Sequence, residues 1–274
     1  SILGIKEKID LAIICVPRDF VLQVLEQCGK KGVKAAVIIT KGFSETGNKK
    51  QEIEILNIAK RYGIRVIGPN CFGVVNTGIS MNTTFATEKI NNGGIAFVSQ
   101  SGALGSAIID LAADGKAGFS KMAFLGNEID IEFNDVLGYL NTDGRTKAVV
   151  LYIEALKHGK KFIEIAKKCG KPIIAIKSGA TAAGSRAALT HTASMTGDSA
   201  VYTAAFKQAG IIQTDSITQA LDIARFISSQ NLPRKTKLKN VLVLSNAGGA
   251  GVLTADYCEK LGLNVVQLPQ KLLE

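Results

Sequence analysis

Short apolar runs alternate with amphipathic segments in the first quarter of the chain. Residues 10–16, 34–40 and 65–68 are nearly continuous apolar runs, which are typical of buried parallel strands. Between them, residues 19–31 and 51–62 carry apolar side chains at helical spacing. This order predicts a β-α-β-α-β layer. In such a layer the helices are right-handed crossovers and the strands run parallel.

The same alternation continues through the middle of the chain. A strand predicted at 95–99 leads into a helix that runs to Asp114. Further predicted strands lie at 121–125, 148–153 and 172–176, and further predicted helices at 132–141, 159–169, 199–209 and 216–228. This order predicts a second open parallel sheet.

Each end of the chain carries less than a whole domain. Residues 240–274 predict one strand–helix–strand unit (240–246, 247–261, 264–268), which is too small to bury a core of its own. We expect a third domain that is cut short, or a unit that packs on the second domain. The first domain lacks the glycine-rich unit that normally opens a nucleotide-binding sheet, so we expect its N-terminal part to be missing. The expected domains are 1–88, 89–230 and 240–274, with a linker at 231–239.

Composition narrows the class of protein. Hydrophobic residues make up 46% of the chain, enough for a sizeable core, and the net charge is +10. No basic run is flanked by aromatic residues, so the charge predicts a solvated surface that attracts anionic ligands such as nucleotides, and no nucleic-acid binding. The five cysteines show no CxxC pair or metal spacing and predict reduced thiols. Without a membrane-length apolar run or a signal peptide, we expect a cytoplasmic protein with no membrane partner.

Candidate ligand-binding residues follow the predicted strands, because open parallel sheets bind ligands at the carboxyl ends of their strands. In the second sheet these ends include residues 126–128 and Glu154. A carboxylate such as Glu154 is either a charge at a helix N-terminus or an active-site group. In the first sheet the strand ends are Val16-Pro17, Thr40-Lys41 and Pro69-Asn70-Cys71.

A predicted anion site opens the first helix of the second domain. Ser101, Gly102 and Ala103 directly follow a strand and begin this helix. Unpaired N–H groups and the positive end of the helix dipole favour anions there. The alternative is an ordinary N-cap serine.

The segment 177–198 is rich in small and hydroxylated residues and contains His191. Small residues let the backbone approach a ligand closely, and a histidine there is either a loop residue bonded to its neighbours or a nucleophile that carries a phosphoryl group. The other histidine, His158, lies in a basic turn that we expect on the surface.

Five motifs, in order, carry a resemblance to a known family. They are DLAIICVP (10–17), IGPNCFGVVN (67–76), VSQSGALG (98–105), LYIE (151–154) and residues 185–197 around the histidine. With them the chain resembles the α subunit or α region of nucleoside-diphosphate-forming acyl-CoA synthetases of the acetyl-CoA synthetase (ADP-forming) type, and more distantly the succinyl-CoA synthetase α subunit. The resemblance implies an α/β fold, with a partial Rossmann-like CoA-binding domain followed by a flavodoxin-like, doubly wound parallel sheet.

The resemblance also implies roles for individual residues. His191 matches the histidine that is phosphorylated, and Glu154 the glutamate that orients it. Ser101, Gly102 and Ala103 match the helix start that holds phosphate. Ala193 departs from the family pattern, which has glycine there, and this puts the geometry of the loop in question. The positions that match CoA contacts are Val16, Pro17, Thr40, Lys41, Pro69, Asn70 and Cys71.

The implied reaction is acyl-CoA, ADP and phosphate to acid, CoA and ATP, through an acyl phosphate and phospho-His191. No Walker lysine, kinase glycine-rich loop or Mg²⁺-ligand cluster is visible, so ADP or ATP and Mg²⁺ are expected on an ATP-grasp partner in an α2β2-type ligase. One alternative is a CoA-binding regulatory module of the kind fused to a protein acetyltransferase, against which the retained His191 argues. The other is an NAD-binding dehydrogenase domain, against which the missing GxGxxG argues.

Overall fold

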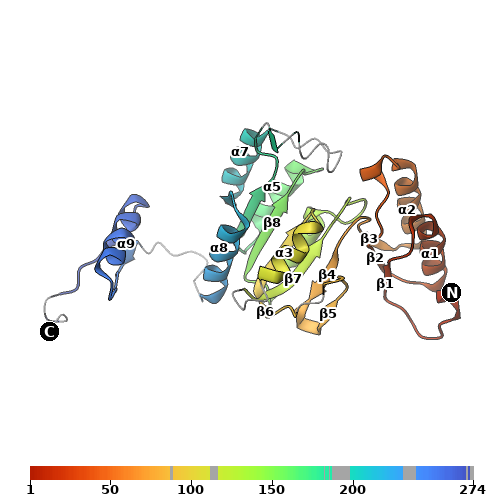
Figure 1. Cartoon of the computed structure of the whole chain (residues 1–274), viewed down its shortest axis with the longest axis horizontal. Helices are drawn as coiled ribbons and strands as arrows, with labels where there is room; N and C mark the ends of the chain where they lie inside the picture. The colour runs from red at the N-terminus through yellow and green to blue at the C-terminus, as the bar shows by residue number, and fades with distance from the viewer. Residues whose placement is uncertain are drawn as a thin grey trace. The chain divides into compact units, whose positions relative to one another are not determined.

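The chain forms two compact units in the computed structural model, Ser1–Asn231 and Leu232–Glu274. Figure 1 shows the elements of both. The structure describes residues 1–86, 89–111, 117–181, 183–184, 186, 198–230, 239–269 and 271. His191 and most of its neighbours therefore lie outside the described residues.

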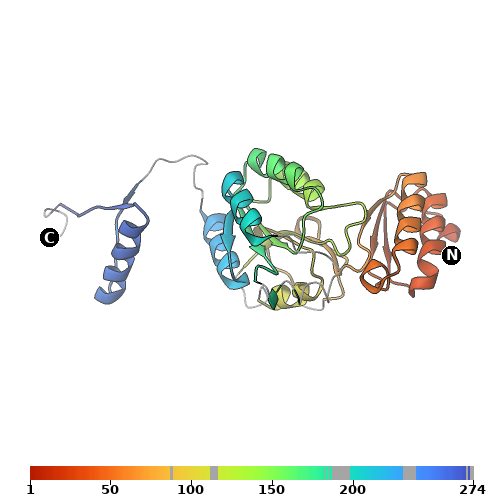
Figure 2. The same cartoon turned by 90° about the horizontal axis from the view of Figure 1, so that it is seen from above.

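The first sheet has the predicted β-α-β-α-β order. Strands β1 (Leu11–Ile14), β2 (Ala35–Ile38) and β3 (Arg65–Ile67) are parallel neighbours in the order β1-β2-β3. Helices α1 (Arg18–Lys31) and α2 (Lys49–Tyr62) lie together on one face of this sheet (Figure 2). Their buried Leu25 and Ile55 pack with the strands, and each helix ends at a left-handed glycine. Short 3-10 turns lie at Ile2–Gly4, Ser44–Thr46 and Thr77–Ile79.

The second sheet has seven strands among the described residues, in the order β10-β9-β8-β6-β7-β4-β5. The first five of this order are parallel, as predicted, whereas β4 runs antiparallel to β7 and β5 antiparallel to β4. The strand bounds are Gly73–Asn76 (β4), Met81–Asn82 (β5), Asn92–Ser99 (β6), Phe119–Phe124 (β7), Ala148–Ile153 (β8), Ile173–Lys177 (β9) and Ile212–Thr214 (β10).

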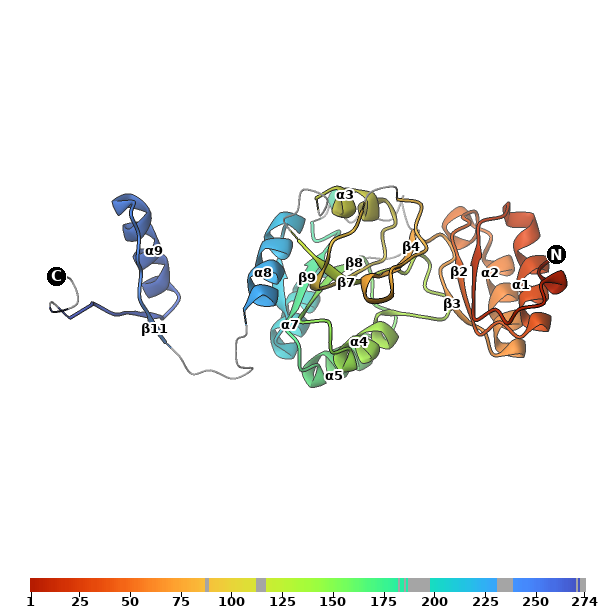
Figure 3. The ribbon, with the colours of Figure 1, turned by 90° about the horizontal axis from the view of Figure 1, so that it is seen from below.

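Helices cover both faces of the second sheet (Figure 3). On one face α3 (Ala103–Leu111) and α8 (Ile217–Ser229) pack against Phe97, Val150 and Ile174. On the other, α4 (Phe133–Thr142), α5 (Gly159–Lys168) and α7 (Ser199–Ala209) pack against strand residues one position further along, such as Val98, Leu151 and Ala175. This alternation explains why the central strands are apolar throughout.

The predicted fold class is confirmed, with differences at the sheet edges. Strands β4, β5 and β10 were not predicted, because they have two to four residues and little apolar content. In the second unit, the strand expected at 240–246 is only Asn240–Val241 (β11), and the one at 264–268 is Asn264–Val265 (β12), flanking α9 (Gly248–Lys260). The two sheets divide between β3 and β4, so β4 and β5 precede the expected boundary at 88. The domain ranges themselves stay a prediction.

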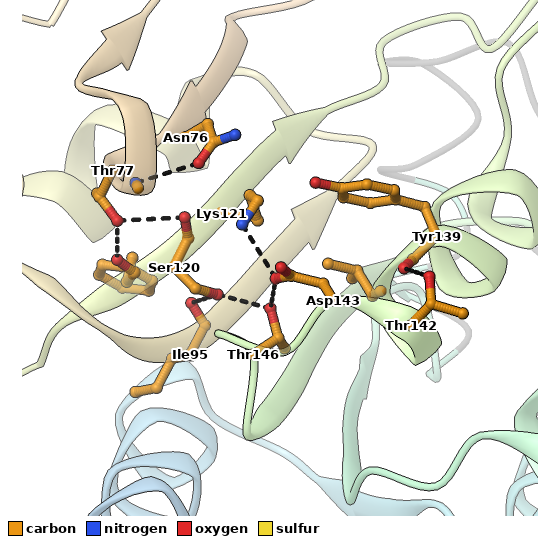
Figure 4. A network of polar contacts seen from close by, with 12 residues as sticks. Asn76, Thr77, Ile95, Ser120, Lys121, Tyr139, Thr142, Asp143 and Thr146 are labelled. Carbon is orange, nitrogen blue, oxygen red and sulfur yellow. Dashed lines mark hydrogen bonds and ion pairs between the residues drawn. The ribbon is translucent and has the colours of Figure 1, made fainter.

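A buried polar network closes the amino-terminal edge of the second sheet (Figure 4). Lys121 Nζ donates to Asp143 Oδ2 (3.0 Å), and both side chains are nearly buried. Thr146 donates to the same oxygen (2.6 Å), and its hydroxyl lies 2.7 Å from that of Ser120. Burial alone would raise the pKa of Asp143, but the hydrogen bonds from Thr146 and Lys121 outweigh it and hold the pKa below its ordinary value.

We predict that Asp143→Ala lowers the free energy of unfolding by about 3 kcal/mol at pH 7, because it leaves the Lys121 ammonium buried without its carboxylate. The matched control is Asp10→Ala, which removes an exposed partner of Lys8 and should leave the free energy of unfolding nearly unchanged, because solvent screens this pair. Because the folded pKa of Asp143 is lowered, its stabilisation is present above pH 3.8 and is lost as pH falls through the folded pKa. Urea titrations at several pH values measure both effects. Equal costs for the two variants would contradict the prediction.

Candidate functional site

A pocket of about 740 Å³ opens at the carboxyl ends of β2, β6, β7 and β8 in the first unit. Both sheets contribute to it, so its walls come from segments that are far apart in the sequence. The lining segments are residues 39–41 and 44–45, 70–72, 100–103, 126–128 and 154–157, together with Phe85 and Ser106.

Most of the predicted site residues converge on this pocket. The lining includes Thr40, Lys41, Asn70, Cys71, Ser101, Gly102, Ala103 and Glu154. Val16, Pro17 and Pro69 are not among the lining residues. Val16 instead accepts a hydrogen bond from Thr40 Oγ1 through its carbonyl (2.7 Å), and the Pro69 carbonyl accepts one from the Asn127 N–H (3.0 Å). These two residues therefore fix the shape of the loops that line the pocket.

Two backbone segments that run against each other hold the sheets together at the pocket. The N–H groups of residues 127, 129 and 131 donate to the carbonyls of residues 69, 68 and 66 at 3.0, 3.3 and 3.1 Å. Gly126 has φ +60, and a Cβ there would collide with the carbonyl oxygens of Pro69 and Asn70. Only glycine permits so close an approach in this backbone conformation.

The side chain of Asn127 reinforces this junction. Its Nδ2 lies within hydrogen-bond distance of Glu45 Oε2 (2.6 Å), Glu52 Oε1 (2.8 Å) and Ser44 Oγ (3.2 Å). Its Oδ1 accepts from Asn70 Nδ2 (3.2 Å). Burial alone would raise the pKa of Glu45, but hydrogen bonds from Asn127 and backbone N–H groups outweigh burial and lower it.

The side chain of Gln100 clamps the backbone at Glu154. Its Oε1 accepts from the N–H groups of Glu154 (2.6 Å) and Ala155 (3.0 Å). Its Nε2 donates to the Ala155 carbonyl (2.7 Å) and to Glu128 Oε2 (2.9 Å). Gln100 therefore fixes the strand end that carries Glu154.

A buried lysine stands beside Glu154. Lys177, the last residue of β9, pairs in register with Ile153, and its Nζ donates to the carbonyls of Glu154 (2.8 Å) and Ser178. The ammonium also lies 4.7 Å from the centroid of the Tyr202 ring. Burial lowers the pKa of Lys177, and the nearby Glu154 opposes this shift. Lys177 lies opposite Ile153, the residue before Glu154. The segment 177–198, which contains His191, therefore begins beside the strand end that carries Glu154.

Sequence reasoning missed two residues of this site, Gln100 and Lys157, and it named Asn127 and Glu128 at a ligand-facing strand end without giving either a role. The strand-end rule did point to residues 126–128, but it gave no means of telling which of their side chains is buried. Gln100 belongs to the VSQSG motif, but only the serine and glycine of this motif were interpreted as an anion site. Lys157 donates from Nζ to the carbonyls of Asn127 (3.0 Å) and Glu128 (2.6 Å), a long-range contact with no local signal.

Two further properties follow from the part of the chain that the structure describes. No group of histidine, cysteine and acidic side chains there is arranged to hold a metal ion. None of the helices described is both long and apolar enough to cross a membrane.

Comparison with known proteins agrees with this geometry. The family described as "CoA binding domain" matches residues 2–77, and the family described as "Succinyl-CoA ligase like flavodoxin domain" matches residues 92–227. The order of these two domains defines a chain of the CoA-ligase class.

Individual relatives define the family more closely. The chain is 47% identical over 278 residues to the α subunit of the ADP-forming acetate–CoA ligase II of Pyrococcus furiosus. The aligned region covers 100% of this chain and 60% of that subunit. It is also 47% identical over 276 residues to the ADP-forming acetate–CoA ligase of Methanocaldococcus jannaschii, covering 100% of this chain and 39% of that protein. The chain belongs to the family of α subunits and α regions of ADP-forming acyl-CoA synthetases.

A solved structure supports the same assignment. The acetyl-coenzyme A synthetase 1 of Candidatus Korarchaeum cryptofilum, determined in complex with phosphate and ADP, matches with a TM-score of 0.91 and 38% identity. The match covers 100% of this chain and 59% of that one. The chain therefore spans about three fifths or less of the length of each of these three relatives.

We predict that Asn127→Ala lowers the free energy of unfolding by about 2 kcal/mol, because it leaves the partly buried carboxylates of Glu45 and Glu52 without a shared donor. The matched control is Asn57→Ala at an exposed position of α2, which should change stability by about 0.5 kcal/mol or less. Chemical denaturation measures both. An Asn127→Ala variant as stable as the control would show that the side chain does not hold the junction.

Proposed function

We propose that this chain is the CoA-binding, phosphohistidine-carrying part of an ADP-forming acyl-CoA synthetase. The overall reaction converts acyl-CoA, ADP and phosphate into the acid, CoA and ATP. Phosphate displaces CoA from the thioester to give an acyl phosphate, and the phosphoryl group then passes to His191 and from there to ADP. The observation that carries the proposal is the pocket that joins the CoA-contact positions of the first sheet to the helix start at Ser101 and to Glu154.

Glu154 and the start of α3 have separate roles in this proposal. Glu154 accepts a hydrogen bond from one ring nitrogen of His191, so that the other nitrogen is unprotonated and attacks phosphorus. Ser101, Gly102 and Ala103 hold the phosphate at the N-terminus of α3, where backbone N–H groups and the helix dipole stabilise transferred negative charge. The clamp by Gln100 supports this role, because it fixes the backbone of Glu154.

CoA is assigned to the strand ends of the first sheet, with Val16, Pro17 and Pro69 shaping the loops. Lys41 and Asn70 line the main pocket and also a second hollow of about 600 Å³ beside it, together with Arg18. Two adjoining hollows with basic residues in their walls fit a long ligand that carries several phosphates. ADP or ATP and Mg²⁺ are assigned to an ATP-grasp partner region, in an α2β2-type assembly or a fused chain, and Mg²⁺ there neutralises the nucleotide phosphates.

We predict that the chain acquires one acid-labile, base-stable phosphate when it is combined with its ATP-grasp partner, ATP and Mg²⁺. His191→Asn should abolish this label, because it removes the nucleophilic imidazole. Glu154→Gln should weaken labelling by about tenfold or more, since the neutral amide orients the ring less well. Labelling with radioactive ATP, followed by acid and base treatment, measures all three.

The matched control for this experiment is His158→Asn. His158 is 65% exposed and pairs with Glu132 Oε2 at 2.8 Å, away from the proposed phosphoryl path, so its variant should label like the wild type. An acid-stable label would indicate serine or threonine. Undiminished labelling of His191→Asn, or no label on the wild type, would favour the regulatory CoA-binding module.

We predict that Lys41→Ala raises the Michaelis constant for CoA by about tenfold, because one charge-assisted contact to a phosphate contributes about 1.5 kcal/mol. Lys34→Ala is the matched control, since Lys34 is also exposed but precedes the same strand and so lies at its opposite end. Its Michaelis constant for CoA should stay that of the wild type. Equal effects of the two variants on the Michaelis constant for CoA would contradict the prediction. They would show that CoA is attracted by the overall basic charge and not by a contact with Lys41.

A further inference from the structure

Glu128 is a buried acidic residue of the pocket to which the proposed mechanism assigns no role. It is 4% exposed and adopts a left-handed conformation with φ +51, which is rare for a residue with a side chain. Lys157 Nζ donates to its carbonyl and to that of Asn127, and so holds this turn. Such a backbone conformation persists only where the surrounding contacts enforce it, and it is common at functional sites.

The two carboxyl oxygens of Glu128 have different surroundings. Oε2 accepts a hydrogen bond from Gln100 Nε2 at 2.9 Å, whereas Oε1 is buried and has no hydrogen-bond partner among the described residues. The ionised form of a buried carboxyl group is disfavoured when one of its oxygens has no hydrogen-bond donor, because a charge in a low-dielectric environment needs donors that compensate for lost water. A carboxylic acid with its proton on Oε1 removes most of that cost.

We propose that Glu128 is a positioning residue that acts as a neutral carboxylic acid. It orients Gln100, and through Gln100 the backbone of Glu154, without adding a second negative charge next to Glu154. The inference rests on the proposed function, because it concerns the pocket in which phosphate would react beside Glu154.

The charged groups around Glu128 support this protonation state. Burial raises its pKa to about 8, and the hydrogen bond from Gln100 and the charge of Lys157 oppose this rise without cancelling it. Glu132 and Glu154 raise the pKa further by repulsion, although Glu132 is itself paired with His158. At neutral pH, Glu128 therefore keeps its proton, whereas above about pH 8 it ionises and repels an anion in the pocket.

The test compares Glu128→Gln with the wild type in complex with the ATP-grasp partner, using inorganic phosphate as the probe. The Michaelis constant of the wild type for phosphate should rise by about fivefold between pH 8 and pH 9, because only the neutral form is competent and its share of the protein falls by that factor. Glu128→Gln should lack this rise, since its amide keeps the contact to Gln100 and does not ionise. The titrations of phosphate and of CoA affect both proteins equally and cancel in the comparison.

Two more variants separate positioning from charge. Glu128→Ala should lower kcat, because Gln100 loses one of its hydrogen-bond partners, and Glu128→Gln should rescue that loss. Glu132→Gln is the matched control, an acidic residue nearby that does not contact Gln100. It should keep the alkaline rise but move it to lower pH, because it removes a charge that raises the pKa of Glu128. An alkaline rise that persists in Glu128→Gln, or a Glu128→Gln variant as impaired as Glu128→Ala, would overturn the proposal.

A measurement on the chain alone distinguishes this inference from the proposed function. The folded pKa of Glu128 lies above its unfolded value of 4.5, so the folded state holds a proton that the unfolded state releases. Stability should fall as pH rises from about 4.5 to about 8 and then level off, and Glu128→Gln should show a shallower fall. An unchanged slope refutes the protonated state. If the slope changes but His191 is never labelled, the proposed function fails and the positioning role fails with it.

Discussion

The pocket depends on one close approach between two backbone segments, residues 66–70 and 126–131. Their hydrogen bonds join the end of β3 in the first sheet to the segment that follows β7 of the second sheet, and the bare Cα of Gly126 lets the segments meet. Because this contact lies at the carboxyl ends of the strands, it brings two separate ligand-binding edges into one hollow. Without it, the strand ends near Thr40 and those near Glu154 would belong to two independent sites.

The sequence was most informative where burial alone determines structure. Strand β8 and helix α7 have the predicted bounds, since continuous apolar runs and helical spacing both reflect contacts with a core. Strand β4 begins with glycine and has four residues, so its place against β7 depends on tertiary pairing that no local pattern encodes. The antiparallel edge of the second sheet was missed for that reason.

The candidate site also has a part that the sequence predicted and a part that it did not. Strand ends and the Ser-Gly helix start were visible in the sequence, because parallel sheets bind ligands at a fixed edge. The contacts that hold them were not visible, because Gln100 and Glu154, or Asn127 and Glu45, are separated by more than 50 residues. The whole fold decides which carboxyl group becomes buried. The sequence therefore could not show that Glu128 is more deeply buried than the residues around it.

Three acidic residues line a pocket that accepts an anion in the proposed function, and each is accommodated differently. The pKa of Glu45 is lowered because Asn127 and backbone N–H groups donate to its carboxylate, which stabilises the charge. Glu128 has too few donors for a charge and keeps its proton instead. Glu154 lies next to the ammonium of Lys177, whose charge offsets its own. A single carboxylate with a nearby cation can orient a neutral imidazole ring without repelling the phosphoryl group that the ring attacks in the proposed function, which is the electrostatic condition for a phosphohistidine site.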